Sequence, residues 1–106
     1  MGMITINDRE VGLFYSVWAV CEFNDWIVEH PDRSYASATV QKAVIMSKAY
    51  CDVHGGKPLS VSEILNLPAY VFNELMEAVA EQEKLDSTRT VVTETVTEKN
   101  AESSAE

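Results

Sequence analysis

The segment LSVSEILNLPAYVFNELMEAV, residues 59–79, carries the strongest local signals for the fold of this 106-residue chain. Ser60 and Glu63 have the spacing of a capping box, in which each side chain binds the other residue's backbone N–H at a helix start. Pro68 is expected to end that short helix and to open a second one, because its missing N–H is tolerated in a first turn. The second helix, predicted to reach Lys84, is expected to bury a face made of Phe72, Leu75, Met76 and Val79. The stretch therefore predicts two amphipathic helices joined at a proline corner.

Two longer helices are predicted before this segment. A Gly-Gly pair at 55–56 ends a helix expected over 37–54, because glycine accepts the left-handed conformation of a C-cap. A proline at position 31 ends an earlier helix expected over 14–29.

The helix expected over 14–29 is apolar on most of its circumference. One face is predicted to hold Phe14, Val17, Trp18, Cys21 and Val28. A solvated acidic stripe is formed by Glu22, Asp25 and Glu29. The apolar surface is widened beyond one stripe by Val20, Phe23, Trp26 and Ile27. Such a helix is either central to its fold or covered by a partner, and in so short a chain the second alternative gains weight.

The two ends of the chain have different characters. Residues 3–13 are predicted to form a β-hairpin, with alternating apolar residues and a turn at Asn7-Asp8. Residues 86–106 contain no aromatic residue and many Thr, Ser and Glu, which predicts a disordered, flexible acidic tail. The sequence therefore predicts a mainly α protein, in which a small domain of three to four helices with its hairpin, residues 1–85, precedes the tail.

The charge balance limits the partners that we expect. Eight Lys and Arg residues stand against 17 Asp and Glu residues, which gives a net charge of −9. Such a field repels phosphate backbones, and no cluster of Lys and Arg overcomes it, so nucleic acid is not an expected partner. No apolar run approaches the roughly 18 residues of a membrane span. No signal peptide is recognisable, so a reducing cytoplasm is the expected compartment for Cys21 and Cys51.

Candidate catalytic and metal sites are weak. Cys51 and His54 stand as Cys-x-x-His at a helix end, where both could reach one metal ion. A structural zinc site uses four such ligands, and only Cys21 and His30 remain, so we expect these residues to be structural and predict no metal or cofactor. The sequence contains no phosphate-binding glycine loop, dinucleotide fingerprint or nucleophile elbow, and we predict no catalytic residue.

Apolar residues in two regions are the candidates for binding a client or partner. Trp18 and Trp26 are eight positions apart, close to two helical turns, so they share a side of their helix. They are predicted to be either core residues or anchors of an interface with another chain. The full candidate set is Trp18, Phe23, Trp26, Ile64, Leu65, Phe72 and Leu75.

Three stretches and a tail occur in a characteristic order. They are MITINDREVGLFYSVWAVCEF (3–23), AVIMSKAY (43–50) and LSVSEILNLPAYVFNELMEAVAE (59–81), with the acidic tail after them. In this order they resemble the tail assembly chaperones of long-tailed bacteriophages and prophages.

Individual positions carry the resemblance. The family's N-terminal hairpin has the pattern Ile-x-Ile-Asn-Gly-x-x-x-Gly-Leu, which Asn7 and Gly12 match, while Asp8 replaces the usual turn glycine. The family often shows Leu-Pro followed closely by Phe-x-x-Leu, and this chain keeps that order at 67–68 and 72–75. The resemblance covers about the first 85 residues of the chain, as a pattern of spacing and hydrophobic type.

The resemblance implies a function. Such chaperones bind the tape measure protein, a long, helical, aggregation-prone chain, and keep it soluble while tail tube subunits assemble around it. Many have a longer, frameshifted product whose extension recruits the tube subunits. They act in the cytoplasm of the bacterial host and are absent from the mature virion. A non-catalytic binding protein without cofactor, acting as a homo-oligomer, is thus expected.

Two other classes of protein fit the same sequence. A head–tail connector or neck protein of the virion is also small, acidic and oligomeric. A small metal-binding or enzymatic accessory protein would use Cys51 and His54. The presence of the protein in purified particles, or of metal in the purified protein, would distinguish these alternatives from a chaperone.

Overall fold

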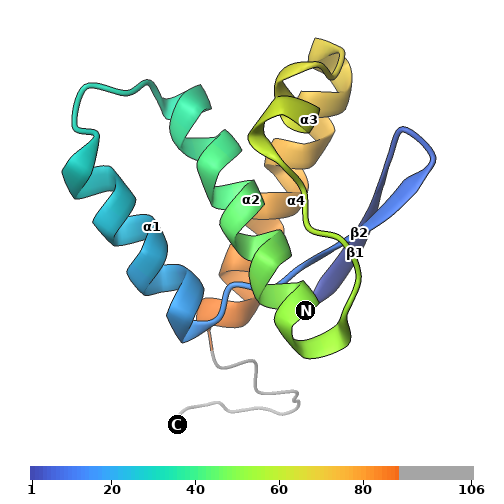
Figure 1. Cartoon of the computed structure of the whole chain (residues 1–106), viewed down its shortest axis with the longest axis horizontal. Coiled ribbons are helices and arrows are strands. Elements are labelled where there is room, and N and C mark those ends of the chain that lie inside the picture. Colours follow the sequence, from blue (N-terminus) through green and yellow to red (C-terminus); the bar gives the residue numbers. More distant parts are fainter. Residues whose placement is uncertain (89–106) are drawn as a thin grey trace, which may run out of the picture.

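The computed structural model describes residues 1–88, in which two strands precede four helices (Figure 1). The elements are β1 (Gly2–Ile6), β2 (Arg9–Leu13), α1 (Val17–Glu29), α2 (Tyr35–His54), α3 (Val61–Leu65) and α4 (Ala69–Ser87). This arrangement confirms the predicted mainly α fold with an N-terminal hairpin. The predicted acidic tail falls on 86–106, of which 89–106 lie outside the described residues.

The hairpin closes through a tight two-residue turn. β1 and β2 pair antiparallel with Ile6 opposite Arg9. Asn7 and Asp8 between them have φ angles of 49° and 63°. Positive φ at both central residues is the geometry of a type I′ turn, whose twist matches that of the strands. Asn and Asp enter this region more readily than most residues, and the predicted turn is confirmed.

The second strand lies directly against α2. A Cβ atom added to Gly12 would lie 2.1 Å from a ring carbon of Tyr50, so a glycine leaves the room that this aromatic ring needs. At the other end of β2, Arg9 pairs with the Glu63 carboxylate and donates to the Lys57 carbonyl. The hairpin is thereby held at one end by packing on α2 and at the other by the segment that enters α3.

α2 is the central helix of the main hydrophobic cluster. Side chains from both strands, α2, α3 and α4 meet there, among them Leu13, Met46, Leu59, Ile64 and Leu75. The buried Ser47 hydroxyl donates to the Val44 carbonyl and accepts the Leu59 N–H, both at 2.9 Å. This side chain therefore fixes the connection between α2 and α3 to the core without leaving a buried polar group unpaired.

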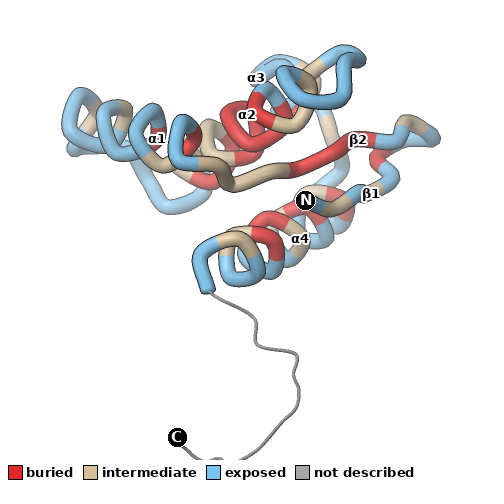
Figure 2. The backbone as a smooth tube through the Cα atoms, turned by 90° about the horizontal axis from the view of Figure 1, so that it is seen from below, coloured by how far each residue is buried: buried red, intermediate tan, exposed pale blue. Residues whose placement is uncertain are grey.

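α1 is attached to the domain through a second, smaller cluster. Ala19 and Phe23 pack against Ile45 and Ala49 of α2. The hydroxyl of Ser16 caps the helix by accepting the Ala19 N–H at 3.2 Å. Most of α1 is exposed, whereas buried residues concentrate on β2, α2 and one side of α4 (Figure 2). α1 thus lies at the edge of the fold and not at its centre.

The apolar face that the sequence predicts for the first helix does not pack against the rest of the domain. The structure exposes Val17, Trp18, Cys21 and Val28, and Phe14 lies before the helix begins. Ala19 and Phe23 face α2 instead. Apolar residues occupy most of the circumference, so periodicity alone does not select one face. The small side chain of Ala19 allows close approach to α2, and this packing decides the orientation.

The proline corner forms as expected, and α4 is longer than predicted. Ser60 Oγ accepts the Glu63 N–H at 3.0 Å and Glu63 Oε1 accepts the Ser60 N–H at 3.4 Å, which confirms the capping box. Pro68 occupies the N-cap position of α4. Asp86, which the sequence places in the tail, lies within α4 and accepts the Tyr15 N–H at 2.9 Å. This hydrogen bond ties the last turn of α4 to the chain before α1, so the helical domain continues beyond its predicted boundary.

Candidate functional site

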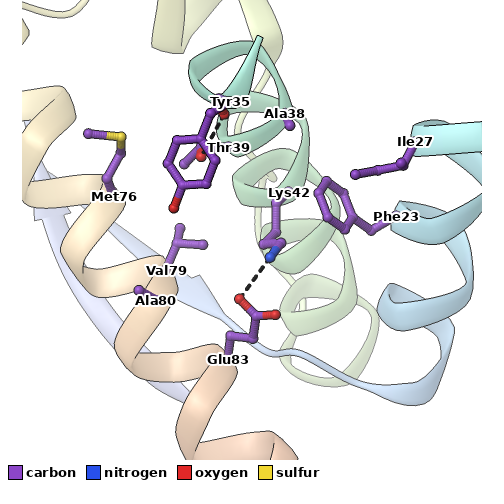
Figure 3. A pocket seen from close by; sticks show the side chains of 10 residues that line it. All are labelled: Phe23, Ile27, Tyr35, Ala38, Thr39, Lys42, Met76, Val79, Ala80 and Glu83. Carbon is purple, nitrogen blue, oxygen red and sulfur yellow. Dashed lines mark hydrogen bonds and ion pairs between the residues drawn. The ribbon is translucent and has the colours of Figure 1, made fainter. Parts of the chain in front are cut away.

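α1 and α4 lie on either side of one face of α2, and a groove of about 160 Å³ runs between them (Figure 3). α2 forms its floor, with Ala38 and Thr39 at the bottom. We call this feature the α1–α4 groove, and it is lined by Phe23, Ile27, Tyr35, Ala38, Thr39, Lys42, Met76, Val79, Ala80 and Glu83. Apolar side chains from two separate helices therefore converge on one concave surface.

One ion pair crosses the groove from its floor to the α4 wall. Lys42 Nζ lies 2.7 Å from Glu83 Oε1, and the same nitrogen lies 4.5 Å from the centre of the Phe23 ring. The lysine charge is neutralised by the carboxylate and further stabilised by the aromatic face. Neither Lys42 nor Glu83 was singled out from the sequence, because the pair joins residues 41 positions apart.

The outer surface of α1 continues the apolar wall of this groove. Val17 and Val28 are 81% and 78% exposed, and Ile27 belongs to both the groove and the outer surface. At 100° per residue, these positions and their neighbours cover about a third of the helix circumference. We call this surface the α1 apolar arc and define it as Val17, Val20, Cys21, Ile27 and Val28, with Asn24 as its one polar position. The arc contains no charged residue.

An acidic stripe runs along α1 beside the apolar arc. It consists of Glu22, Asp25 and Glu29, and none of these carboxylates forms an ion pair within residues 1–88. Trp18 and Trp26 lie on the same side, where they line a hollow with the acidic residues. The ring of Trp26 stacks on His30 at 4.7 Å, so this tryptophan is engaged within the fold. Trp18, at 43% exposure, is the freer of the two.

A second concave surface lies where α3 meets the N-terminal parts of α2 and α4. This α3 pocket, of about 260 Å³, is lined by Ala36, Ser37, Val40, Ile64, Leu65, Leu67, Ala69 and Phe72. Leu65 is 68% exposed at its rim, while Ile64 is buried and belongs to the core. The proline corner thus produces a shallow apolar depression, as its two amphipathic pieces meet at an angle.

The seven predicted binding residues do not form one surface. Ile64, Leu65 and Phe72 meet in the α3 pocket, and Phe23 lines the α1–α4 groove. Trp18 and Trp26 share the acidic side of α1, and Leu75 is fully buried in the core. Core positions such as Leu75 have the same apolar character as binding positions, which is why the sequence could not separate them. Val17, Val28, Met76 and Ala80 were not proposed as binding residues, and no pattern in the sequence distinguishes them.

Both histidines have contacts within the fold, whereas Cys21 is exposed on α1, so the expectation that it is a structural residue is wrong. His54 Nε2 lies 3.2 Å from the sulfur of Met1, and its ring centre lies 4.4 Å from that of Tyr50. Cys21 and Cys51 are free thiols. Within the part of the chain that the structure describes, no three His, Cys, Asp or Glu side chains gather where they could share a metal ion.

Three titratable groups have shifted pKa values, and each connects elements of the fold. Burial opposes ionisation of Asp86, but hydrogen bonds, including that from the Tyr15 N–H, outweigh it and hold the pKa of this carboxyl below its usual value. The hydrogen bond from the Arg9 guanidinium lowers the pKa of Glu63. Burial, together with the carboxylate of Glu83, raises the pKa of the Tyr15 phenol. Protonation or deprotonation of these groups is therefore expected to change the stability of the fold. The grooves, in contrast, are lined mostly by apolar side chains, which suit the binding of another apolar surface.

No helix within residues 1–88 combines the length and the apolar character that a membrane span requires. The grooves and exposed surfaces of the domain are the basis for a functional proposal. No protein-family model, curated protein or solved structure matches this chain.

Proposed function

We propose that this protein is a non-catalytic chaperone of phage tail assembly, which binds the tape measure protein and keeps it soluble while the tail is built. The observation that carries the proposal is the α1 apolar arc. Val17 and Val28 are almost fully exposed on a chain with a net charge of −9. Apolar surface gathered on one helix of a small acidic protein is typical of a site that another chain covers.

The attachment of α1 suits a binding helix. Only Ala19 and Phe23 of this helix are buried, so its outer surface contributes little to the stability of the domain. Burying a valine side chain against a client contributes roughly 1.5 kcal/mol or more to binding. A long helical client would offer such contacts repeatedly, and several copies bound along it would act together.

The acidic exterior suits a chaperone that keeps an aggregation-prone client in solution. Asp and Glu outnumber Lys and Arg by 17 to 8. A complex coated by such chains carries a large negative charge, and mutual repulsion between complexes opposes aggregation. Repulsion between complexes requires only that the chains stay bound, and no catalytic step is involved.

The resemblance to tail assembly chaperones supports the same function. Two positions match the family's hairpin pattern. Asn7 forms the type I′ turn together with Asp8, and Gly12 makes the close contact with α2. Leu75, which matches the C-terminal pattern, is a core residue. These positions have physical roles in the fold, and they support a shared domain type. A protein with this function would act in the cytoplasm of a bacterial host. Tail tube subunits would be further partners, and the protein would be absent from the mature virion.

The proposal is tested at the native locus and then by co-expression. We expect the gene to be followed by one very long gene that encodes a helical protein. Co-expression with this chain should raise the soluble fraction of that product severalfold, measured after high-speed sedimentation. An unrelated helical protein of similar size and charge serves as the control and should leave the soluble fraction unchanged. Equal solubility with both proteins would contradict the proposal.

Purified virions separate a chaperone from a structural component. A chaperone should be undetectable in them by mass spectrometry. Stoichiometric amounts of the chain in particles would instead identify it as a head–tail connector or neck protein, whose permanent interface would also cover the α1 apolar arc.

A further inference from the structure

We infer that residues 90–97 add a third strand to the hairpin by pairing with the open edge of β1. This inference goes beyond the proposed function, because it assigns an interaction within the chain to the segment that follows the helical domain. The backbone groups on the outer edge of β1, the place where α4 ends and the composition of residues 90–97 support it.

The outward-facing backbone groups of β1 belong to Met3 and Thr5. β1 and β2 are joined by a two-residue turn with Ile6 opposite Arg9. The residues that flank such a turn form a hydrogen-bonded pair, and bonded and non-bonded pairs then alternate along the strands. Met3 and Thr5 fall on non-bonded pairs, so their N–H and C=O groups point away from β2. Within residues 1–88, neither residue has a backbone hydrogen bond outside the hairpin.

The helices leave this edge open. A Cβ atom on Gly2 would point at the Gln82 side chain, so α4 meets the face of β1 and not its edge. α2 lies beside β2, where the Phe14 N–H donates to the Met46 carbonyl at 3.1 Å. Met3 on β1 is 54% exposed. The outer side of β1 is therefore the accessible edge of the hairpin.

The sequence of β1 lacks the features that usually keep an edge strand from pairing with other chains. Proteins protect such edges with charged side chains, prolines or bulges, or they cover the edge with another part of the chain. β1 reads GMITI, without a charge or a proline, and its register with β2 has no bulge. In the whole chain, by contrast, 24% of the residues are charged. An edge of this kind is expected to be covered.

The segment that follows α4 starts beside β1. Asp86, in the last turn of α4, lies 3.3 Å from the nitrogen of Met1. The end of α4 and the start of β1 therefore lie at the same end of the domain (Figure 1). Thr88 is the last described residue. Residues 89–97 can span up to about 30 Å, about twice the length of a five-residue strand, so they are long enough to turn back and follow β1.

The composition of this segment suits an added strand. Seven of the eight residues in TVVTETVT (90–97) are Thr or Val, whose β-branched side chains favour strands. Arg89 and Glu94 are the only charged residues in 89–97, so this part has no net charge. A strand added to an open edge gains backbone hydrogen bonds that it lacks alone. The short connection to α4 gives the segment a high effective concentration at its own β1, which favours it over the same segment of a second copy.

Hydrogen exchange measured by NMR on the full chain tests the inference. The double variant Val92→Pro/Thr93→Pro removes two consecutive N–H groups, one of which faces β1 because strand N–H groups alternate in direction. We expect the Met3 and Thr5 amides to exchange at least about tenfold faster in this variant than in the wild type. Equal exchange rates in the two proteins would overturn the inference.

Two controls show that a change is specific. The double variant Ser103→Pro/Ser104→Pro lies outside the inferred strand, and its two outer-edge amides should exchange at the wild-type rate. A loss of protection as large as that in the other variant would contradict the assignment to 90–97. The amides of Ile4 and Ile6, which bond to β2, should stay protected in both variants, because the hairpin itself remains folded.

Nuclear Overhauser contacts identify the strand that pairs with the edge. We expect contacts of Met3 and Thr5 with residues 90–97 of the same chain. A sample that mixes ¹⁵N-labelled with ¹³C-labelled chains reveals contacts between copies. If the edge instead contacts residues 90–97 or β1 of a second copy, another chain occupies it and the inference is wrong.

Discussion

α1 and α4 pack on the same central helix, yet they contribute to the fold in different ways. α4 buries Val71, Leu75, Val79 and Gln82, whereas α1 buries only Ala19 and Phe23. The apolar residues of α4 mostly share one face, while those of α1 surround the helix. Because α2 offers α1 only one contact surface, the remaining apolar residues of α1 are left exposed. The comparison shows that two helices packed on the same partner can differ widely in how much of their apolar surface the fold buries.

Truncation of the central residue of α4 should have the largest effect. Leu75 is fully buried, and Leu75→Ala removes apolar contacts and leaves a cavity in the main cluster. We expect a loss of about 3 kcal/mol or more in the free energy of unfolding, measured by urea denaturation. A loss below about 1 kcal/mol would show that α4 is no better anchored than α1.

The corresponding change in α1 should cost less. Phe23 is also buried, but it belongs to the smaller cluster and borders the open α1–α4 groove, into which neighbouring side chains can relax. We expect Phe23→Ala to lower the free energy of unfolding by about 2 kcal/mol in the same assay. Hydrogen exchange should show faster opening in α1 than in α4. A loss equal to that of Leu75→Ala would remove the distinction between the two helices.

Asp86 joins the two helices, since it lies on α4 and accepts the Tyr15 N–H before α1. Its pKa in the folded state is depressed below the ordinary value of 3.8, so its contribution to stability is present above that pH and is lost as the pH falls through the folded value. Asp86→Asn should therefore destabilise the protein by about 1 kcal/mol at neutral pH. Thermal unfolding should show that this deficit shrinks below about pH 4. A deficit that stays constant down to strongly acidic pH would show that the carboxylate charge is not involved.

The smallest effect is expected on the exposed face of α1. Val28→Ser should change the free energy of unfolding by less than about 0.5 kcal/mol, because the side chain has no buried contact to lose. Differential scanning calorimetry checks this with Val79→Ser in α4 as the matched change, for which we expect a loss of several kcal/mol. A large loss for Val28→Ser would mean that the arc is covered within the protein.

The sequence predicted those parts of the fold that local chemistry determines. The capping box of Ser60 and Glu63 and the turn at Asn7-Asp8 depend on residues close in the chain, and both are present. The hairpin and the helices were likewise predicted within a few residues of their ends. The end of α4 was missed because Asp86 is held by Tyr15, a residue 71 positions away.

The residues of the candidate site were harder to predict from the sequence than the fold. Phe23 was predicted to bind a partner and does line the α1–α4 groove, but Leu75 was predicted with it and lies in the core. Which face of α1 stays exposed depends on its packing against α2, and no local pattern encodes that choice. The Lys42–Glu83 pair likewise exists only because two distant helices lie side by side. Surfaces made by tertiary packing therefore required the structure.

The close contact between Gly12 and Tyr50 gives a criterion for recognising distant relatives of this chain. The aromatic ring occupies the space that a side chain at position 12 would need, so position 12 cannot gain a side chain while the ring stays in place. A descendant that acquires a larger residue at position 12 must also acquire a smaller one at position 50, or separate its hairpin from its central helix. Relatives that have an aromatic ring at position 50 are therefore expected to keep glycine at position 12.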